Sequence, residues 1–269
     1  MIECARAACP SALGGRQTDM TLAALVPFLL IMLAPAIGSF LAVLVDRLPR
    51  GEDVMRARSG CRACATPLAP WDMIPVASYM ALRGRCRSCG ASIPPFLLYM
   101  ELLALGAAVL AVLAGGSSLQ IILSAIWLWL LIALAVSDLI WFRLPDLLTA
   151  GLALTALFLS TMPGGLGVIT MAAGAALGAG SFVVLRWVYK RLRHRDGLGL
   201  GDVKLMVGLG GFVGPFDLPL LVLMAALTAL ALAILTRSGA DGMNGGRALP
   251  FGASLCAAGA VLWLLGAGS

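Results

Sequence analysis

Two aspartates lie at the ends of apolar runs, where burying a charged side chain costs free energy, and together they could perform acid–base chemistry. Asp138 follows the apolar run 119–137, and Asp202 lies in Gly199-Leu200-Gly201-Asp202-Val203-Lys204, between a basic run and an apolar segment. Carboxylates at a membrane edge are rare and are therefore functional candidates. Hydrolysis of a peptide by carboxylates needs two of them, because one accepts a proton from the attacking water while the other polarises the carbonyl or donates to the leaving group. Two adjacent carboxyls would share a proton.

The same aspartates also admit a structural interpretation. They could cap their helices or pair with Arg143 and Lys204, since Gly-x-Gly-Asp is a short pattern. Gly199 and Gly201 allow an unusual backbone and the close approach of a substrate strand. Asp146 predicts an N-cap for the helix that follows it.

Four of the seven cysteines form two Cys-x2-Cys pairs that are separated by 21 residues; these are Cys61, Cys64, Cys86 and Cys89. Two such pairs in one loop give a tetrahedral Cys4 site with a spacing close to that of zinc ribbons. Four thiolates leave no open coordination position, so we predict a structural zinc. A redox-active dithiol is the alternative.

Composition indicates a polytopic membrane protein. Of the 269 residues, 61% are hydrophobic and 12% are charged, whereas soluble domains carry about 25% charged residues. At about 20 residues per crossing, the apolar runs predict eight membrane helices. The runs are 21–45, 95–114, 119–137, 147–162, 166–189, 203–216, 218–236 and 248–267.

The predicted fold is therefore an all-α membrane helix bundle with a small cytoplasmic Cys4 loop after the first helix. We expect an N-terminal tail at 1–20, the first transmembrane helix at 21–45, the zinc-binding loop at 46–94 and a membrane-embedded domain at 95–269. The run 21–45 is too long for the core of a signal peptide, which has about 7–15 residues. Small residues within 171–180 predict close helix packing.

The distribution of charge predicts the orientation in the membrane. The formal net charge is +6. If the N-terminus is outside, the inside segments 46–94, 138–146, 190–202 and 237–247, with Arg186 and Lys204 beside them, hold every Lys and Arg except Arg6 and Arg16. Both aspartates then lie at the cytoplasmic face, where permanent disulfides are not expected. Basic residues that flank apolar runs set topology, so we predict no nucleic-acid binding.

Taken in order, the motifs resemble those of the type IV prepilin peptidase family. The members of this family are GxGD aspartic proteases. The resemblance covers nearly the whole chain from about residue 36. The matching motifs are Gly38-Ser39-Phe40-Leu41 with Arg47-Leu48-Pro49, the two cysteine pairs with Ile74-Pro75 and Leu82-Arg83-Gly84-Arg85-Cys86, Ser137-Asp138 with Leu144-Pro145-Asp146, Gly199-Leu200-Gly201-Asp202-Val203-Lys204-Leu205, and Leu249-Pro250-Phe251-Gly252.

This resemblance implies a multi-pass enzyme of the bacterial inner membrane with its active site facing the cytoplasm. It implies cleavage of the leader peptide of type IV prepilins or pseudopilins, the substrates of pilus assembly or type II secretion, and N-methylation of the new N-terminus with S-adenosylmethionine. The catalytic pair would be Asp138 and Asp202, which makes 95–269 an aspartic peptidase domain. The surrounding substrate loop would contain Gly199, Gly201, Lys204 and Asp146.

The N-terminal part departs from the family pattern. Ala42 stands where the family usually has Asn, and Phe96, Leu97 and Leu98 replace an Arg-Tyr-Pro ahead of Glu101. Glu101 is a candidate cofactor contact, or a polar residue paired within the bundle. This part of the family is linked with methyl transfer, so a peptidase without methyltransferase activity is an alternative. A thiol oxidoreductase and a proton-coupled transporter are further alternatives.

Overall fold

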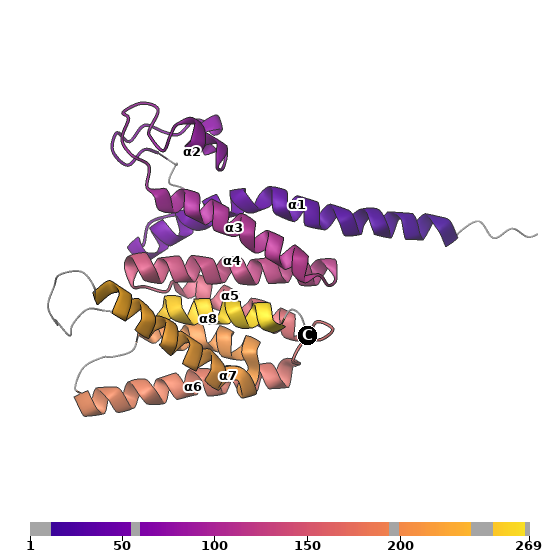
Figure 1. Ribbon diagram of the computed structural model, residues 1–269, viewed down its shortest axis with the longest axis vertical. Helices are drawn as coiled ribbons and strands as arrows, with labels where there is room; N and C mark the ends of the chain where they lie inside the picture. The colour runs from indigo at the N-terminus through magenta and orange to yellow at the C-terminus, as the bar shows by residue number, and fades with distance from the viewer. Residues whose placement is uncertain (1–11, 55–59, 194–198, 238–249, 267–269) are drawn as a thin grey trace, which may run out of the picture.

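The computed structural model describes residues 12–54, 60–193, 199–237 and 250–266, and the regular secondary structure of this part consists of helices and two isolated β-bridges. Residues 1–11, 55–59, 194–198, 238–249 and 267–269 lie outside it, and with them parts of the predicted tail, of three predicted inside segments, of the last apolar run and of the last motif, including Leu249. The long helices are α1 (Ala12–Arg47), α3 (Pro95–Ala114), α4 (Ser118–Trp141), α5 (Asp146–Ser160), α6 (Val168–Arg193), α7 (Leu200–Arg237) and α8 (Phe251–Gly266) (Figure 1). The loop after α1 holds the short helices η1 (Leu48–Arg50), η2 (Pro70–Met73) and α2 (Ala77–Ala81).

Several of these helices suit a membrane. In the described part of the chain, five helices are long and apolar enough to cross it: α1 from Leu25, α3, α4, α6 and α7. Helices α5 and α8 are apolar but shorter, with 15 and 16 residues. The chain is thus a multi-pass membrane protein with an all-α fold, as predicted.

The first helix is longer than predicted. It begins at Ala12 and ends at Arg47, so residues 12–20 are helical and are not an irregular tail. The sequence has no proline between Pro10 and Pro27, and Ala, Leu, Arg and Gln in this stretch favour a helix.

Helix α7 reverses direction at Gly214, which has φ 81° and ψ 173° within an otherwise helical run. A side chain added at Gly178 of α6 would come within 3.1 Å of both Met206 and Leu218. In a straight helix these two residues would be about 18 Å apart along the axis, so the chain must fold back between them. Two helical segments therefore occupy the predicted runs 203–216 and 218–236. The count of eight membrane crossings stays a prediction.

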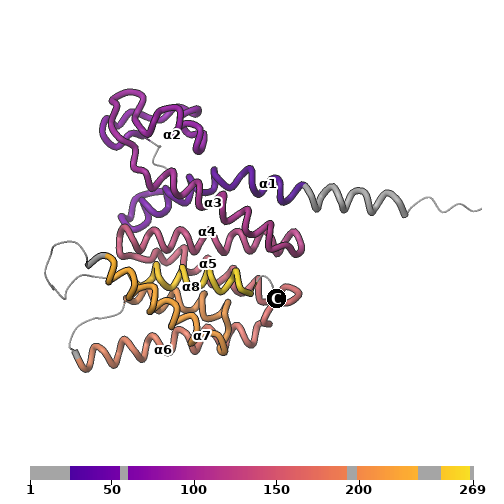
Figure 2. The backbone as a smooth tube through the Cα atoms, in the orientation of Figure 1, coloured from indigo at the N-terminus to yellow at the C-terminus, as the bar shows by residue number. Residues whose placement is uncertain are grey.

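Two helices, α5 and α8, pack against both of the helices that carry the aspartates. Helix α4, which carries Asp138, packs against α1, α3, α5 and α8, whereas α7, which carries Asp202, packs against α5, α6 and α8. Figure 2 shows α5 and α8 between α4 and α7. The starts of α5 and α8 therefore lie close to the end of α4 and the start of α7.

Small residues allow the helices to approach closely, as predicted for 171–180. A Cβ at Gly174 of α6 would lie only 2.2 Å from the carbonyl oxygen of Gly210 in α7. On the other side of the bundle, the buried face of α3 is rich in alanine, and the indole N–H of Trp129 in α4 donates to the carbonyl of Ala104 at 2.9 Å. Such contacts replace the hydrophobic driving force that is weak between helices in lipid.

Candidate active site

Asp138 is held by the first turn of α8. Helix α4 continues to Trp141, beyond the predicted end at 137, so Asp138 lies in its last turn and is 6% exposed. The backbone N–H of Ala253 donates to Oδ2 of Asp138 at 2.8 Å, and the N–H of Gly252 also donates to this carboxylate. The N-terminal amides of a helix have no intrahelical partner, so they suit a carboxylate.

The connector between α4 and α5 folds back over the end of α4. Phe142 adopts a left-handed conformation, with φ 51°, that ends the helix. The hydroxyl of Ser137 donates to the carbonyl of Arg143 at 2.7 Å, and the guanidinium of Arg143 donates to the carbonyl of Pro49 at 3.0 Å. Arg143 therefore holds the end of α1 and does not pair with Asp138, contrary to the structural interpretation of the sequence.

Asp202 is the third residue of α7 and accepts the backbone N–H of Gly199. This contact resembles the returning arm of a capping box, so Asp202 does cap its helix. The predicted pairing with Lys204 is not found among the described residues, because the ammonium of Lys204 lies 2.6 Å from Oδ1 of Asp146.

The two aspartates lie close together. Their carboxylates are near enough for their charges to interact. Leu144 lies between the two helix starts around them, because its Cδ1 would be 3.2 Å from a Cβ at Gly201 and 3.0 Å from one at Gly252. A Cβ at Gly252 would also be 3.0 Å from Oδ2 of Asp138. The ends of α4, α7 and α8 thus converge on one small site that holds both acids.

Gly201 makes room for Leu144, where a Cβ would come within 3.1 Å of its side chain. The prediction that Asp146 is an N-cap was wrong. Asp146 is the first residue of α5 and not its N-cap, a position that Pro145 occupies without a side-chain hydrogen bond. The carboxylate of Asp146 is then available to Lys204.

The sequence analysis missed Cys256. This cysteine of α8 is 1% exposed and close enough to Asp138 and Asp202 to interact with both charges. It lies one helical turn after Gly252 and Ala253, which bond Asp138. A helix drawn from the Pro250-Phe251-Gly252 motif would have placed it on the same face.

The four paired cysteines form one cluster whose Sγ atoms all lie within 4.8 Å of one another. The distances are 3.8 Å between Cys61 and Cys89 and 4.0 Å between Cys64 and Cys86. Four sulfurs at about 2.3 Å from a tetrahedral zinc would be about 3.8 Å apart. The cluster therefore fits a metal ion, and no other cluster of at least three potential ligands occurs in the part of the chain that the structure describes.

The thiols of this cluster influence one another. Hydrogen bonds with Thr66 lower the pKa of Cys64 to about 6. At Cys89 the hydrogen bond from the Ala91 amide lowers the pKa, but contacts with the other thiols, first of all Cys64, outweigh it and raise the pKa to about 12. The four sulfurs cannot all ionise side by side unless a cation balances them, which is what a bound metal would do.

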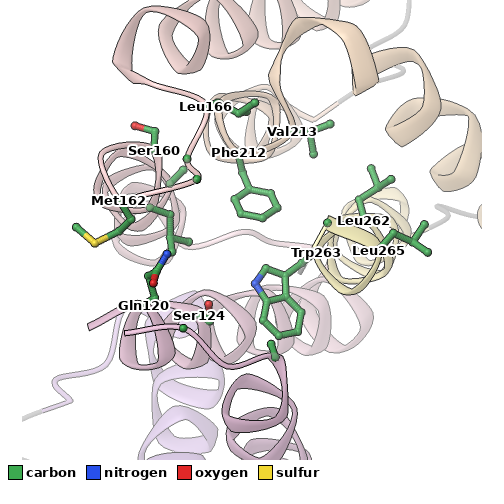
Figure 3. A pocket seen from close by; sticks show the side chains of 18 of the residues that line it. Gln120, Ser124, Ser160, Met162, Leu166, Phe212, Val213, Leu262, Trp263 and Leu265 are labelled. Atoms are coloured by element: carbon green, nitrogen blue, oxygen red, sulfur yellow. The ribbon is translucent and has the colours of Figure 1, made fainter. Parts of the chain in front are cut away.

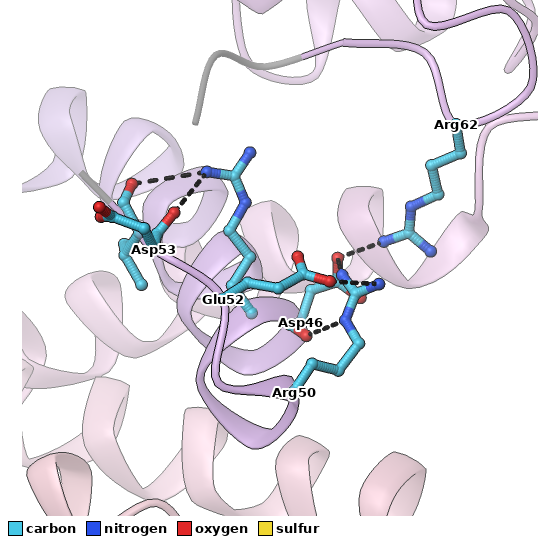
Figure 4. A network of polar contacts seen from close by, with 7 residues as sticks. Asp46, Arg50, Glu52, Asp53 and Arg62 are labelled. Carbon is cyan, nitrogen blue, oxygen red and sulfur yellow. Dashed lines mark hydrogen bonds and ion pairs between the residues drawn. The ribbon is translucent and has the colours of Figure 1, made fainter. Parts of the chain in front are cut away.

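A network of ion pairs attaches the cysteine loop to the end of α1 (Figure 4). Asp46 accepts from Arg50 and, at 2.7 Å, from Arg62, the residue next to Cys61. Arg50 also pairs with Glu52 at 3.3 Å. The guanidinium of Arg62 lies 5.8 Å from the ring of Phe96 in α3. The first cysteine pair is therefore fixed against both α1 and α3.

Glu101 connects the same loop to α3. Its side chain is 8% exposed, and Oε2 accepts the backbone N–H of Val76 at 2.6 Å. Val76 has φ 60° and ψ −51°, and the N–H of Ala77 donates to the carbonyl of Pro75 at 2.6 Å, which defines a γ-turn. This conformation is strained for a β-branched residue and persists only where its surroundings hold it.

A cavity of about 550 Å³ lies between the cysteine loop and the helices α1 and α3, and we call it the loop cavity. Glu101 lines it together with Ser39, Ala42, Val43, Leu97 and Leu98 of the helices, and Cys61, Trp71, Asp72, Tyr79 and Cys86 of the loop. The departures from the family pattern at Ala42, Leu97 and Leu98 therefore face one enclosed space.

A second cavity, of about 690 Å³, lies at the opposite end of the bundle. Figure 3 shows Phe212 and Trp263 pointing into it, with Gln120 and Ser124 on another wall. Ser124 is 14 residues before Asp138 in α4, or about 21 Å along the helix. Among the described residues that line this cavity, Asp217 is the one carboxylate, so the cavity offers no pair of acids.

Comparison with known proteins places the chain among prepilin-processing proteins. Residues 32–114 match the Bacterial Peptidase A24 N-terminal domain, and residues 125–234 match the Type IV leader peptidase family. The Type 4 prepilin-like proteins leader peptide-processing enzyme of Escherichia coli O78:H11 is 33% identical over 241 residues, which cover 81% of this chain and 86% of that protein.

Two further relatives carry the name prepilin leader peptidase/N-methyltransferase. The protein of Aeromonas hydrophila is 33% identical over 267 residues, covering 87% of this chain and 90% of its own length. The protein of Pseudomonas putida is 32% identical over 283 residues, covering 92% of this chain and 95% of its own length. No solved structure matches the chain.

Proposed function

The chain belongs to the type IV leader peptidase family, and from this premise we propose that it cleaves the leader peptide of type IV prepilins or pseudopilins with Asp138 and Asp202 as its catalytic pair. Family membership confirms the resemblance that the motifs predicted. The observation that carries the assignment of the pair is the convergence of both carboxylates at the joined ends of α4, α7 and α8.

The contacts of the two acids suggest which of them acts as the general base and which as the general acid. Oδ2 of Asp138 accepts the N–H of Ala253, so this oxygen does not carry the shared proton. We assign Asp138 as the base that takes a proton from the attacking water, while Asp202 gives its proton to the carbonyl oxygen of the scissile bond. The new C–O bond gives a tetrahedral intermediate. When its C–N bond breaks, Asp138 passes the proton taken from water to the leaving amine, and a hydroxyl of the intermediate returns a proton to Asp202 as the carboxyl group forms.

The site is proposed to face the cytoplasm from the bacterial inner membrane. The basic residues that set topology flank the end of the bundle at which α4 ends and α7 begins. A substrate whose apolar helix lies in the bilayer would then present its leader to the two acids. Asp138 lies in the last turn of α4 and Asp202 in the first turn of α7. These positions at helix ends argue against a transporter, which would place its acids near the midplane of the membrane.

We also propose that the chain N-methylates the new N-terminus, as the names of its relatives imply for those proteins. S-adenosylmethionine would supply the methyl group by breaking its S–CH3 bond, which leaves a neutral thioether. The new N-terminus would react as the neutral amine and would lose a proton to solvent once the N–CH3 bond has formed. The four cysteines would hold a structural zinc, because they fit a tetrahedral ion and leave no position open for chemistry. No disulfide joins the cysteines in the described part of the chain.

A cleavage-and-mass assay tests both activities. Purified protein in lipid is incubated with an intact prepilin, with and without S-adenosylmethionine, beside Asp138→Asn and Asp202→Asn. We expect leader loss in the wild type alone, with a cofactor-dependent methyl mass on the product. Leader loss without the methyl mass would identify a peptidase that lacks the transferase. Cleavage that survives either substitution would reduce these aspartates to helix-capping residues.

A further inference from the structure

Glu101 is a buried carboxylate that has no cationic partner in the part of the chain that the structure describes. The other carboxylates that line the loop cavity are balanced, because Asp46 pairs with Arg50 and Arg62, and Asp72 pairs with Arg87 at 2.7 Å. Glu101 accepts one backbone N–H, and no ion pair to it occurs among the described residues. A buried charge that is not paired is costly, and such a charge beside a cavity marks a place for a ligand of opposite sign.

The loop cavity has the size and the walls of a small-molecule site. Its volume of about 550 Å³ falls within the range of about 300–1,000 Å³ that is usual for such sites. Ala42, Leu97 and Leu98 provide an apolar wall from the bundle, whereas Trp71 and Tyr79 provide aromatic side chains from the loop. An aromatic side chain on one side and an unbalanced carboxylate on the other suit a cation that also carries a flat ring.

We propose that the loop cavity binds the methyl donor S-adenosylmethionine and that the carboxylate of Glu101 faces its positive charge. This inference rests on the methyltransferase activity proposed above, and it gives that activity a location away from the aspartate pair. The donor carries a sulfonium, whereas its product S-adenosylhomocysteine has a neutral sulfur. A carboxylate placed for the sulfonium therefore favours the donor over the product.

A purely structural role for Glu101 makes a different prediction. If Glu101 serves only to hold the γ-turn at Val76, then any side chain that accepts this N–H will do. Glu101→Gln keeps the length and an acceptor oxygen but removes the charge. The variant therefore separates the charge from the hydrogen bond, and S-adenosylhomocysteine provides a ligand that differs from the donor in the charge and one methyl group.

The test measures the dissociation constants of both ligands by equilibrium dialysis, with full-length protein in lipid nanodiscs. We expect the wild type to bind the donor more tightly than the product. Because it removes the charged partner of the sulfonium, Glu101→Gln should weaken donor binding by about tenfold or more. Binding of the product should change by less than about threefold on the same scale. Glu52→Gln, in the same loop but outside the cavity, is the matched control and should change neither constant.

Leader cleavage in the absence of donor serves as the independent readout. We expect Glu101→Gln to cleave at the wild-type rate, which shows that the peptidase is folded. A wild type that cleaves but binds neither ligand would overturn the inference and leave the proposed peptidase intact. The same conclusion would follow if Glu101→Gln lost affinity for donor and product equally, or lost affinity for neither. A wild type that binds the donor but does not cleave would instead refute the proposed peptidase.

A second variant covers the case in which Glu101→Gln does not fold. Trp71 lines the loop cavity and is 63% exposed, so Trp71→Ala should not disturb the packing of the bundle. We expect this variant to weaken donor and product alike, because both carry the same adenine ring for the indole to stack on. Unchanged binding of both ligands in Trp71→Ala would place the donor outside this cavity.

Discussion

The carboxylate of Asp138 accepts the backbone N–H of Ala253 at 2.8 Å, across 115 residues of sequence. This bond fixes one member of the aspartate pair to the first turn of α8. The neighbouring residue Gly252 has no side chain, and the space that a Cβ would fill is taken by Asp138 and Leu144. The geometry of the pair therefore depends on a helix that carries no acid of its own.

Gly252→Ala should impair cleavage without unfolding the protein. The added methyl would lie 3.0 Å from Oδ2 of Asp138 and would push the carboxylate away from its place. Small displacements of catalytic groups reduce rates by up to about a hundredfold, so we expect a fall in kcat of about 10- to 100-fold. The assay is leader cleavage under saturating substrate. Gly106→Ala is the control, because a Cβ there meets open space; equal kcat values for the two variants would contradict the close packing at Asp138.

The pair formed by Lys204 and Asp146 should matter little to the chemistry. Their side chains are 50% and 75% exposed, and exposed ion pairs contribute about 0.2–1 kcal/mol. Lys204→Met and Asp146→Asn should each reduce kcat/KM by less than about fivefold, which corresponds to 1 kcal/mol. Cleavage of a prepilin at several substrate concentrations measures this. A loss above a hundredfold in Lys204→Met would show that the ammonium contacts the substrate or the aspartates.

The purified protein should contain about one zinc per chain, because four thiolates fill one tetrahedral site. Replacing a ligand in Cys64→Ser should lower this content and expose the loop at 60–94 to proteolysis, whereas Cys9→Ser, outside both cysteine pairs, should change neither. Elemental analysis and limited proteolysis are the measurements. Two disulfides and no metal would favour the redox alternative.

Gly174→Ala should destabilise the contact between α6 and α7. The new methyl would lie 2.2 Å from the carbonyl oxygen of Gly210, so the helices must separate. Overpacking of this kind costs about 1–3 kcal/mol. A lower midpoint of thermal unfolding in detergent would show it. Gly180→Ala, on the same helix but with open space around it, should leave the midpoint unchanged; similar midpoints for both variants would refute the close contact.

Sequence alone predicted the parts that depend on composition and spacing. The apolar runs predicted the helices, and the two Cys-x2-Cys pairs predicted a Cys4 cluster, because each signal lies within one stretch of chain. The two aspartates were predicted as a pair because each ends or begins an apolar run on the same side of the membrane. Their proximity in the structure follows from α5 and α8, which pack against both parent helices.

Contacts between distant stretches escaped the sequence analysis. Nothing near Asp138 indicates that its donor is Ala253, and nothing near Lys204 indicates Asp146 in preference to the closer Asp202. The sequence could not distinguish a ligand-binding role for Glu101 from a structural one, because that distinction depends on the cavity beside it and on its bond to Val76. Hydrogen-bond partners of this kind are set by how helices pack, which a period of 3.6 residues does not encode.

The bond from α8 to Asp138 also sets the order in which activity can arise during synthesis. A nascent chain that has inserted its first 237 residues already holds both aspartates, but it lacks Ala253 and the rest of the last helix. The carboxylate of Asp138 then has no helix start to orient it. With Asp138 and Asp202 as the proposed catalytic pair, the protease therefore becomes competent only when its final helix has entered the bundle.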